Sequence, residues 1–205
     1  RQLQQPCYLI GGFVRDKIIG RKTKDIDIVC VGDGIALAHQ VAELFKHNPP
    51  VAVFKNFGTA QIKVDDMEIE FVGARKESYR SESRNPDVEP GTLEDDQLRR
   101  DLTINALAIS LNKGDFGALI DPFDGQRDIE YGLLRTPGPP DQTFIDDPLR
   151  MMRTIRFAAQ LHFEIEQSTF EAIKRNADRI GIISKERIAD ELNKILLCKK
   201  PSVGF

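Results

Sequence analysis

Two aspartates separated by one residue are the clearest candidates for metal chemistry in this sequence. Asp25 and Asp27 open residues 25–31, a segment that alternates polar and apolar residues at its start, as a strand does. On a strand both carboxylates project from the same face, about 7 Å apart along the backbone. Mg²⁺ takes one or two carboxylates together with substrate phosphates, and two such ions can clamp the attacking and leaving oxygens of an in-line displacement. The alternative is a solvated strand end.

Two glycines ahead of a predicted helix could bind a phosphate. The apolar run of residues 7–10 ends at Gly11 and Gly12, and the pattern of residues 13–19 predicts a helix. Backbone N–H groups and the positive end of the dipole at a helix N-terminus favour an anion, and Arg15 lies one turn in. The alternative is a tight turn with a surface arginine. The aspartate pair on the next strand favours the phosphate interpretation, because a phosphate cradle and a metal platform would then adjoin.

A pair of arginines precedes an apolar segment. Arg99 and Arg100 fall in the middle of a helix that we expect to run from Thr92, in a capping box with Asp95, toward Leu111. Adjacent helical residues point about 100° apart, so at most one of the two arginines faces a site. Arg100 is our candidate. The alternative is a solvated helical face with an i,i+4 ion pair between Asp95 and Arg99.

A row of charged residues every three positions indicates a ridge on one helix. Asp147, Arg150, Arg153 and Arg156 offer one carboxylate and three cations, which suits a polyanion and one base edge. Asp147 has a second interpretation, because Asp followed by Pro148 is typical of an N-cap and first helical residue. The opposite face of the helix supplies the predicted core residues Leu149, Met152, Ile155 and Ala159.

The elements that position these residues fall into two predicted domains. Residues 1–136 have the pattern of a mixed α/β domain, whose last three strands have short turns and should form an antiparallel meander. Residues 137–140 (Pro-Gly-Pro-Pro) are the clearest linker, and residues 137–205 show only helical periodicity. The predicted strands are 7–10, 25–31, 51–54, 60–64 and 67–72, and the predicted helices are 13–19, 35–46, 148–160, 168–179 and 185–198.

Residues 74–91 have almost no apolar content and contain two prolines. Such a composition cannot bury enough apolar surface to order the chain, so we predict a mobile loop here.

Composition narrows the class of protein further. The 205 residues include 29 Lys and Arg and 32 Asp and Glu, which gives a formal charge of −3. The overall charge therefore does not indicate a nucleic-acid-binding protein. We find no apolar stretch of bilayer length and predict a soluble protein. Cys7, Cys30 and Cys198 are an odd number without C-x-x-C spacing, which argues against a disulfide framework and a thiolate zinc site and fits a reducing cytosol. Because the chain opens on Arg1, we expect it to be part of a longer protein.

Taken together, the segments resemble the class II tRNA nucleotidyltransferases, the family of CCA-adding enzymes and bacterial poly(A) polymerases. The resemblance covers nearly the whole chain in order, and R-R-D-x-T-I-N-A-L is its most specific part. Residues 121–125 and 186–191 also resemble family segments. The segments that carry it are residues 11–16 (GGFVRD), 24–27 (KDID), 99–107 (RRDLTINAL) and 147–153 (DPLRMMR).

The resemblance implies a polymerase-β-like palm followed by an all-α neck, and a cytoplasmic enzyme that adds CMP and AMP from CTP and ATP to the 3′ end of tRNA. Asp25 and Asp27 would then bind Mg²⁺ or Mn²⁺. It also implies that Gly11, Gly12 and Arg15 meet the triphosphate and that Arg100 and Asp101 lie near the ribose. Asp147 and Arg150 would read the base, with Arg153 and Arg156 also at the nucleotide. Finally, the loop at residues 74–91 would help the site switch between C and A addition.

Hydrogen-bonding chemistry supports the base-reading role. Cytosine and adenine each present an amino donor beside a ring-nitrogen acceptor, which the Asp147 carboxylate and the Arg150 guanidinium can both satisfy. Guanine and uracil present the reverse pattern, and each mispair leaves two buried polar groups unsatisfied at a cost of about 1–3 kcal/mol apiece. The alternatives within the class are a poly(A) polymerase and an enzyme that adds only C or only A. From another class, the chain could be a nucleotide- or RNA-binding module without turnover.

Overall fold

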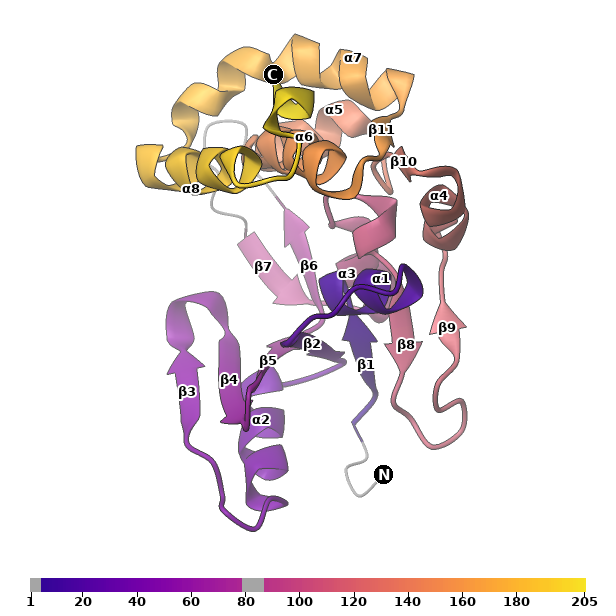
Figure 1. Ribbon diagram of the computed structural model, residues 1–205. Helices are drawn as coiled ribbons and strands as arrows, with labels where there is room; N and C mark the ends of the chain where they lie inside the picture. The colour runs from indigo at the N-terminus through magenta and orange to yellow at the C-terminus, as the bar shows by residue number, and fades with distance from the viewer. Residues whose placement is uncertain (1–4, 79–86) are drawn as a thin grey trace. The chain divides into compact units, whose positions relative to one another are not determined.

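The computed structural model describes residues 5–78 and 87–205 (Figure 1). The chain forms two compact units. Residues 123–136 pack within the second unit, so these units do not coincide with the two predicted domains, and a domain boundary at residue 136 stays a prediction. The first unit comprises Arg1–Lys76, Val88–Gln97 and Asn105–Pro122, and the second comprises Glu77–Asp87, Leu98–Ile104 and Phe123–Phe205.

A seven-stranded mixed sheet forms the first unit, in the order β3-β4-β5-β2-β1-β8-β9 (Figure 1). Every neighbouring pair is antiparallel except β2 and β5, which are parallel. The predicted meander is confirmed, because β4 pairs antiparallel with both β3 and β5. The strands are β1 (Cys7–Ile10), β2 (Asp25–Cys30), β3 (Val51–Phe54), β4 (Thr59–Val64), β5 (Met67–Gly73), β8 (Ala108–Ser110) and β9 (Leu119–Ile120).

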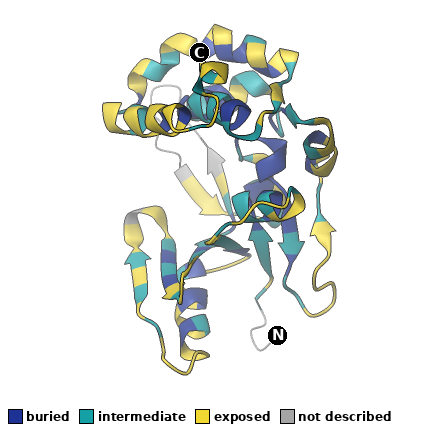
Figure 2. Ribbon diagram, viewed as in Figure 1, coloured by how far each residue is buried: buried dark blue, intermediate teal, exposed yellow. Residues whose placement is uncertain are grey.

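Helix α2 (Gly34–Glu43) covers one face of this sheet. Its N-terminus is capped by Asp33, whose side chain accepts hydrogen bonds from the N–H groups of Ile35 and Ala36. The helix and the sheet share an apolar core that is almost fully buried (Figure 2). The main members of this core are Leu37, Ala38 and Ala42 from the helix and Ala60, Ile62 and Phe71 from the strands.

The prediction of a helix from Thr92 toward Leu111 is correct for its first turns and wrong beyond them. Thr92 and Asp95 do form the capping box, with reciprocal bonds of 2.8 and 3.2 Å, but α3 (Leu93–Leu98) ends after six residues. The chain then makes a 3₁₀ turn at Thr103–Asn105 and enters β8, which pairs with β1 and β9. The Gln97 amide donates to the carbonyls of Ala106 and Ile120 and so ties the end of α3 to this part of the sheet. Tertiary pairing overrides the apolar periodicity here.

The flanks of the predicted mobile loop are ordered, so that prediction is wrong for them. β6 (Arg75–Ser78) and β7 (Asp87–Pro90) form a two-stranded sheet, and the Gly91 N–H donates to the Ala74 carbonyl over 2.9 Å at its base. Backbone pairing between strands does not require apolar side chains, so the composition of residues 74–91 did not indicate these two strands. The middle of the loop, residues 79–86, lies outside the described residues.

The second unit is mostly helical. Two apolar clusters hold it together: Leu102, Ile104, Leu134 and Phe157 in one, and Phe144, Met151, Ala172 and Ile173 in the other. The last residue of the predicted linker at residues 137–140, Pro140, is already the first residue of a helix. Short strands β10 (Leu133–Leu134) and β11 (Glu164–Ile165) pair in parallel, which the helical periodicity did not indicate. The helices are α4 (Gly125–Tyr131), α5 (Pro140–Asp146), α6 (Leu149–Leu161), α7 (Gln167–Asn176) and α8 (Lys185–Leu196).

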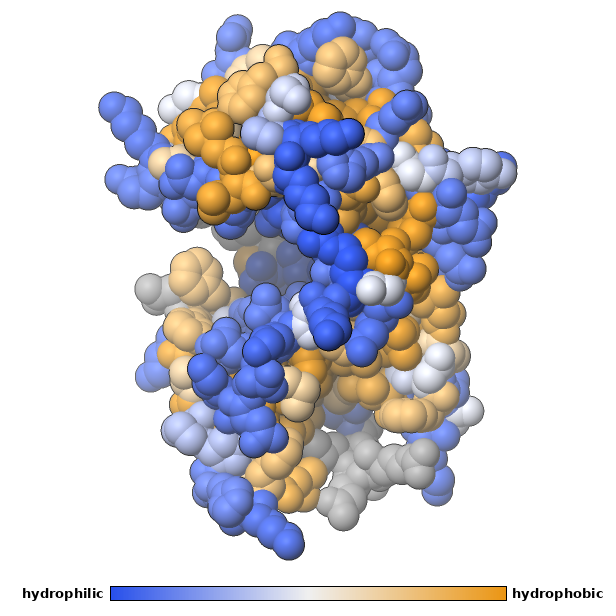
Figure 3. Space-filling model, in the orientation of Figure 1, coloured by the Kyte–Doolittle hydropathy of each residue, from blue (hydrophilic) through white to orange (hydrophobic). Residues whose placement is uncertain are grey.

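An apolar patch lies over α8 and the C-terminal turn of the second unit (Figure 3). Leu197 and Phe205 are its most exposed members, at 86% and 80% of their surface. Leu196 and Val203 are about half exposed and continue the patch. In the described residues, no helix combines the length and the apolar character that a membrane crossing requires.

Candidate active site

The aspartate pair lies at the start of β2, on an inner strand of the sheet. Asp25 is exposed and Asp27 is half-buried, and their i,i+2 spacing places both on one face. The parallel register sets Glu68 of β5 beside Asp25 and Glu70 beside Asp27. Since neighbouring strands lie about 4.8 Å apart, the half-buried Glu70 is the nearest same-face neighbour of Asp27 on β5. Glu70 was not among the predicted site residues, because only strand register brings it there.

The donor set fits a hard divalent cation that is completed by its substrate. Among the described residues, no three His, Cys, Asp or Glu side chains are grouped closely enough to hold a metal ion on their own. Mg²⁺ in phosphoryl-transfer sites is bound by one or two carboxylates together with phosphate oxygens and water. Two carboxylates on one strand face therefore suffice for an ion that arrives with a triphosphate.

The glycine turn follows β1 on the neighbouring strand. Gly11 has φ 76°, a left-handed conformation that favours glycine, and its N–H donates to the Leu107 carbonyl over 3.2 Å. Helix α1 (Gly12–Ile18) follows directly. Arg15 is only 5% exposed, and its guanidinium donates to the Asn105 side chain and to Asp16 over 2.9 Å. Arg15 thus braces the turn against the R-R-D-x-T-I-N-A-L segment instead of lying on the surface.

Asp101 and Arg153 form an ion pair inside the second unit. Asp101 is buried: one carboxylate oxygen accepts from the Leu102 N–H and the other from Arg153 Nε, over 2.9 and 2.7 Å. The pKa of Arg153 is raised by the Asp101 charge. Arg100 is half-buried and follows α3, so the argument that assigned it from helical geometry does not hold. The structure brings Asp101 and Arg153 together, although the sequence placed them in separate segments.

The two predicted base-reading residues make local contacts at the junction of α5 and α6. One Asp147 oxygen accepts from the Leu149 N–H over 3.1 Å, as a capping side chain does, and the other pairs with Arg187 of α8 over 3.2 Å. Arg150 is buried, and its Nη1 donates to the Thr143 carbonyl over 3.3 Å. The capping interpretation of Asp147 therefore describes one of its contacts in this structure.

Helix α6 does not have the two faces that its charge spacing predicted. Of the four predicted core residues, Leu149 and Ala159 are buried, but Met152 and Ile155 are half-buried. Met151, Thr154 and Phe157 are buried as well. Arg150 is buried as well, so the row of arginines does not form one exposed ridge. Neighbouring elements surround α6 on more than one side, and an apolar stripe opposite a charged stripe is then not required.

Arg156 lies in a buried charge cluster with α8. Its Nε donates to Glu191 over 2.6 Å and its Nη1 to Gln160 over 2.7 Å, while the guanidinium lies 4.0 Å from the centre of the Phe157 ring. Glu191 is 3% exposed and also accepts from Lys194 over 3.0 Å. Burial lowers the pKa of Arg156, against the opposing effect of Glu191. Arg156 and Glu191 thus join α6 to α8, and the predicted contact of Arg156 with a nucleotide stays a prediction.

Acid should weaken this cluster. Burial raises the pKa of Glu191, but Arg156 and Lys194 outweigh it, so the pKa lies below the usual value of 4.5. The folded state therefore binds the Glu191 proton less readily than the unfolded state. The stabilisation is present above pH 4.5 and is lost as the pH falls through the lowered value. Urea titrations at pH 7 and pH 3 should show a smaller acid loss for Glu191→Gln than for the unmodified protein. An equal loss would contradict the assignment.

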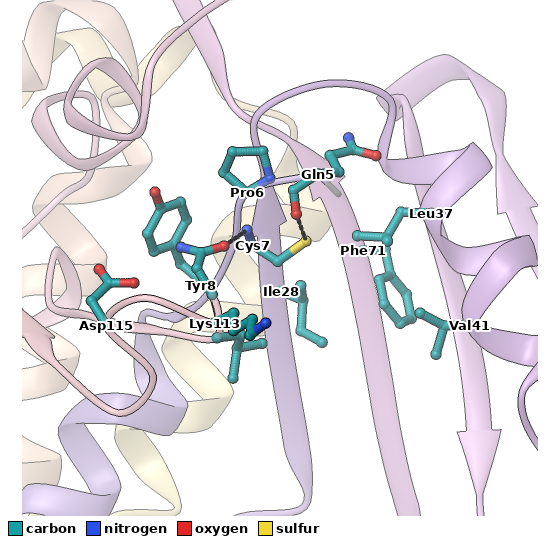
Figure 4. A pocket seen from close by; sticks show the side chains of 12 residues that line it. Gln5, Pro6, Cys7, Tyr8, Ile28, Leu37, Val41, Phe71, Lys113 and Asp115 are labelled. Atoms are coloured by element: carbon teal, nitrogen blue, oxygen red, sulfur yellow. Dashed lines mark hydrogen bonds between the residues drawn. The ribbon is translucent and has the colours of Figure 1, made fainter. Parts of the chain in front are cut away.

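A separate cavity of about 670 Å³ lies at the other end of β1 and β2 (Figure 4). Cys7, which lines it, pairs with Cys30 at the far end of β2 from Asp25. The Cys7 N–H donates to the Asn112 side chain over 2.9 Å, and Ile28 and Phe71 contribute apolar walls. The cavity includes none of the predicted site residues and is distinct from the carboxylate face.

The mixed sheet, with paired aspartates on an inner strand beside a glycine turn, fits the palm of a nucleotidyltransferase. The chain matches the family model described as poly A polymerase head domain over residues 7–135, and the model described as probable RNA and SrmB-binding site of polymerase A over residues 162–205. The chain therefore belongs to the poly(A) polymerase head domain family, as the resemblance predicted.

Individual relatives agree with this assignment. The chain is 40% identical over 191 residues to the A-adding tRNA nucleotidyltransferase of Aquifex aeolicus (strain VF5), covering 93% of this chain and 23% of the relative. It is 40% identical over 201 residues to the CCA-adding enzyme of Ligilactobacillus salivarius (strain UCC118), covering 97% of this chain and 47% of the relative. The chain thus spans less than half the length of these curated relatives.

Solved structures share the fold. A CCA-adding enzyme in its apo form II matches with a TM-score of 0.87 and 36% identity, over 98% of this chain and 47% of that one. A tRNA nucleotidyltransferase complexed with a primer tRNA and an incoming ATP analog matches with a TM-score of 0.83 and 36% identity, over 98% of this chain and 55% of that one. The predicted combination of a mixed sheet and helices is confirmed.

Proposed function

We propose that this chain is the nucleotide-adding part of a tRNA nucleotidyltransferase, which transfers CMP and AMP from CTP and ATP to the 3′ end of tRNA with release of pyrophosphate. The observation that carries the proposal is the same-face pair Asp25 and Asp27 on β2, beside Glu70 and next to the strand that leads into the Gly11 turn. The tRNA- and nucleotide-bound relative supports the choice of substrates. A test is incorporation of labelled CTP and ATP into tRNA that lacks its terminal CCA.

In this proposal Asp25 and Asp27 bind Mg²⁺ or Mn²⁺, with Glu70 as a neighbouring carboxylate. A bound divalent ion would stabilise charge on the phosphates and activate the attacking 3′ hydroxyl. The start of α1 places backbone N–H groups next to the strand that pairs with β2, and Arg15 holds the preceding turn in shape through Asn105. Contacts of Gly11, Gly12 and Arg15 with the triphosphate, and of Arg100 and Asp101 with the ribose, are part of the proposal.

A narrower activity is the second candidate. The Aquifex relative and the relative from Geobacter sulfurreducens are named A-adding enzymes, whereas the Ligilactobacillus relative is named CCA-adding. Three primers separate these possibilities: tRNA that lacks CCA, tRNA that ends in C, and tRNA that ends in CC. Full CCA addition extends all three primers to CCA, and A-only addition extends the primer that ends in CC.

Asp147 and Arg150 are proposed to select the base, and Asp147→Asn separates selection from capping. Asparagine keeps an oxygen that can accept from the Leu149 N–H, but its amide donor faces the carbonyl oxygen of guanine or uracil. We expect a gain of roughly 5- to 150-fold in relative use of UTP and GTP. Competition assays with all four nucleotides measure it, and Arg150→Ala should relax selection in the same assay.

The capping interpretation makes a different prediction for the same residue. Asp147→Ala would then lower the melting temperature while C and A selectivity persists, because the Leu149 N–H and Arg187 lose a partner. Unchanged selectivity in Asp147→Asn together with that loss in Asp147→Ala would remove Asp147 from base selection.

A reducing, cytoplasmic location is part of the proposal. Cys7, Cys30 and Cys198 are all free thiols. Burial raises the pKa of Cys30 to about 12, so its reactive thiolate form is scarce at neutral pH.

A further inference from the structure

A hollow of about 450 Å³ opens on the same face of the sheet as Asp27. Strand alternation places the site carboxylates and the hollow on one side, while Ala60, Ile62 and Phe71 of the same strands face the α2 core. The hollow is lined by Phe54, Phe57, Thr59, Gln61, Glu70 and Arg75.

Strand register connects the hollow to the aspartates. Gln61 of β4 lies opposite Glu70 of β5, and Glu70 lies beside Asp27 of β2, so the three form one row across the sheet. Phe54 of β3 pairs with Thr59, which is one pleat further along the same face. With strands about 4.8 Å apart, Phe54 stands roughly 15 Å from Asp27, a distance that a few nucleotides of single-stranded RNA can span.

Two phenylalanines are exposed at this hollow. Phe54 is 44% exposed and Phe57 is 69% exposed, although burying such a side chain is worth about 1.5–3 kcal/mol. Phe57 ends the 3₁₀ turn Lys55–Phe57, which Gly58 closes in a left-handed conformation with φ 64°. Arg75 Nη1 donates to the Phe57 carbonyl over 3.1 Å, which holds the turn in place, and Arg75 lines the same hollow as the two rings. Exposed aromatic rings on a fixed backbone are suited to stacking.

The chemistry of the lining favours a nucleobase over an apolar side chain. A base has a flat face that stacks on an aromatic ring and a polar edge that needs hydrogen-bonding partners. Phe54 and Phe57 offer the first, while Thr59, Arg75 and the amide oxygen of Gln61 offer the second. The Gln61 Nε2 donates to Glu68 over 3.3 Å. We propose that Phe54 and Phe57 form a stacking platform for an unpaired base of the RNA primer, a few nucleotides before the 3′ hydroxyl that reacts. This inference rests on the proposed function and adds the residues that position its primer.

The test measures primer and nucleotide kinetics separately in the full-length protein. The RNA is a tRNA acceptor hairpin whose unpaired 3′ end carries 2-aminopurine, a base whose fluorescence is quenched by stacking. We expect Phe54→Ala with Phe57→Ala to raise the KM for this RNA by roughly 5- to 150-fold and to relieve the quenching. The KM for CTP and ATP should stay unchanged, and Phe54→Tyr with Phe57→Tyr should restore primer binding.

Phe45→Ala is the matched control, because Phe45 is 37% exposed and follows α2, on the opposite side of the sheet. It should leave the primer KM unchanged. An unaltered primer KM and quenching in the double alanine variant would overturn the platform while leaving the proposed function standing. If the unmodified protein adds no nucleotide to the RNA, the proposed function itself is wrong. Equal losses in the alanine and tyrosine variants would also overturn stacking and indicate a structural role.

Discussion

Asp25→Ala and Asp27→Ala should each abolish addition of both C and A while the protein stays folded. Both residues lie at the accessible start of β2, outside the apolar cores, so their loss removes little packing. If they bind the divalent ion, losing either removes several kcal/mol of transition-state stabilisation, on the order of a thousandfold in rate. Single-turnover addition to tRNA measures the rate, and a thermal melt confirms the fold.

The control for this prediction is Asp66→Ala. Asp66 is an exposed carboxylate of the β4–β5 turn that pairs with Lys24 over 2.8 Å, so it is close in sequence to β5 but has no place on the carboxylate face. It should keep the unmodified rate. Glu70→Gln tests whether Glu70 assists the aspartates. A lower rate would support that role, and an unchanged rate would exclude it. Near-normal metal-dependent addition by either aspartate variant would remove the pair from catalysis.

The largest loss of stability is expected at the Arg156 and Glu191 pair. The two side chains are 12% and 4% exposed and lie 2.6 Å apart. Removal of Glu191 leaves the Arg156 charge without its carboxylate, and removal of Arg156 leaves the buried Glu191 carboxylate with Lys194 as its cation. Arg156→Ala or Glu191→Ala should lower the free energy of unfolding by about 3–5 kcal/mol. Urea denaturation followed by circular dichroism measures the change.

Two comparisons isolate the buried charge as the cause. Arg156→Met combined with Glu191→Leu should lose much less than either single change, because neither buried charge of the pair remains and Lys194 is more than half exposed. Arg175→Ala should have little effect, since Arg175 and Asp141 are about half exposed and water replaces the lost contact. If Arg156→Ala instead keeps its stability and binds CTP and ATP more weakly, the predicted nucleotide contact of Arg156 is correct.

Local patterns predicted the parts of the fold that local physics decides. The alternation in β2 and the capping box of Thr92 with Asp95 need only neighbours in sequence. The helix expected to run to Leu111 failed because β8 gains its stability from β1, about a hundred residues away. An apolar run of that length fits a helix and a buried strand equally well until its partner is known.

The residues of the candidate site also fall into those that sequence spacing predicts and those that only the fold brings together. Asp25 and Asp27 were found from their spacing, and they do share one face of an inner strand. Glu70, Asn105 and Glu191 were missed as site residues, since their places follow from strand register or helix packing. Charge spacing on α6 was misleading for a related reason: it shows where arginines lie on a helix, but not which carboxylates of the fold neutralise them.

The position of β1 has a consequence for how the protein is made. β1 lies between β2, which follows it closely in sequence, and β8, which is synthesised about a hundred residues later. A ribosome adding about 5–20 residues per second needs some 5–20 seconds to supply β8. During that interval one edge of β1 has no strand to pair with, and an open edge is a template for pairing with another chain. The nascent protein is therefore most exposed to aggregation before residue 110 leaves the ribosome, and dependence on chaperones should fall once β8 closes the sheet.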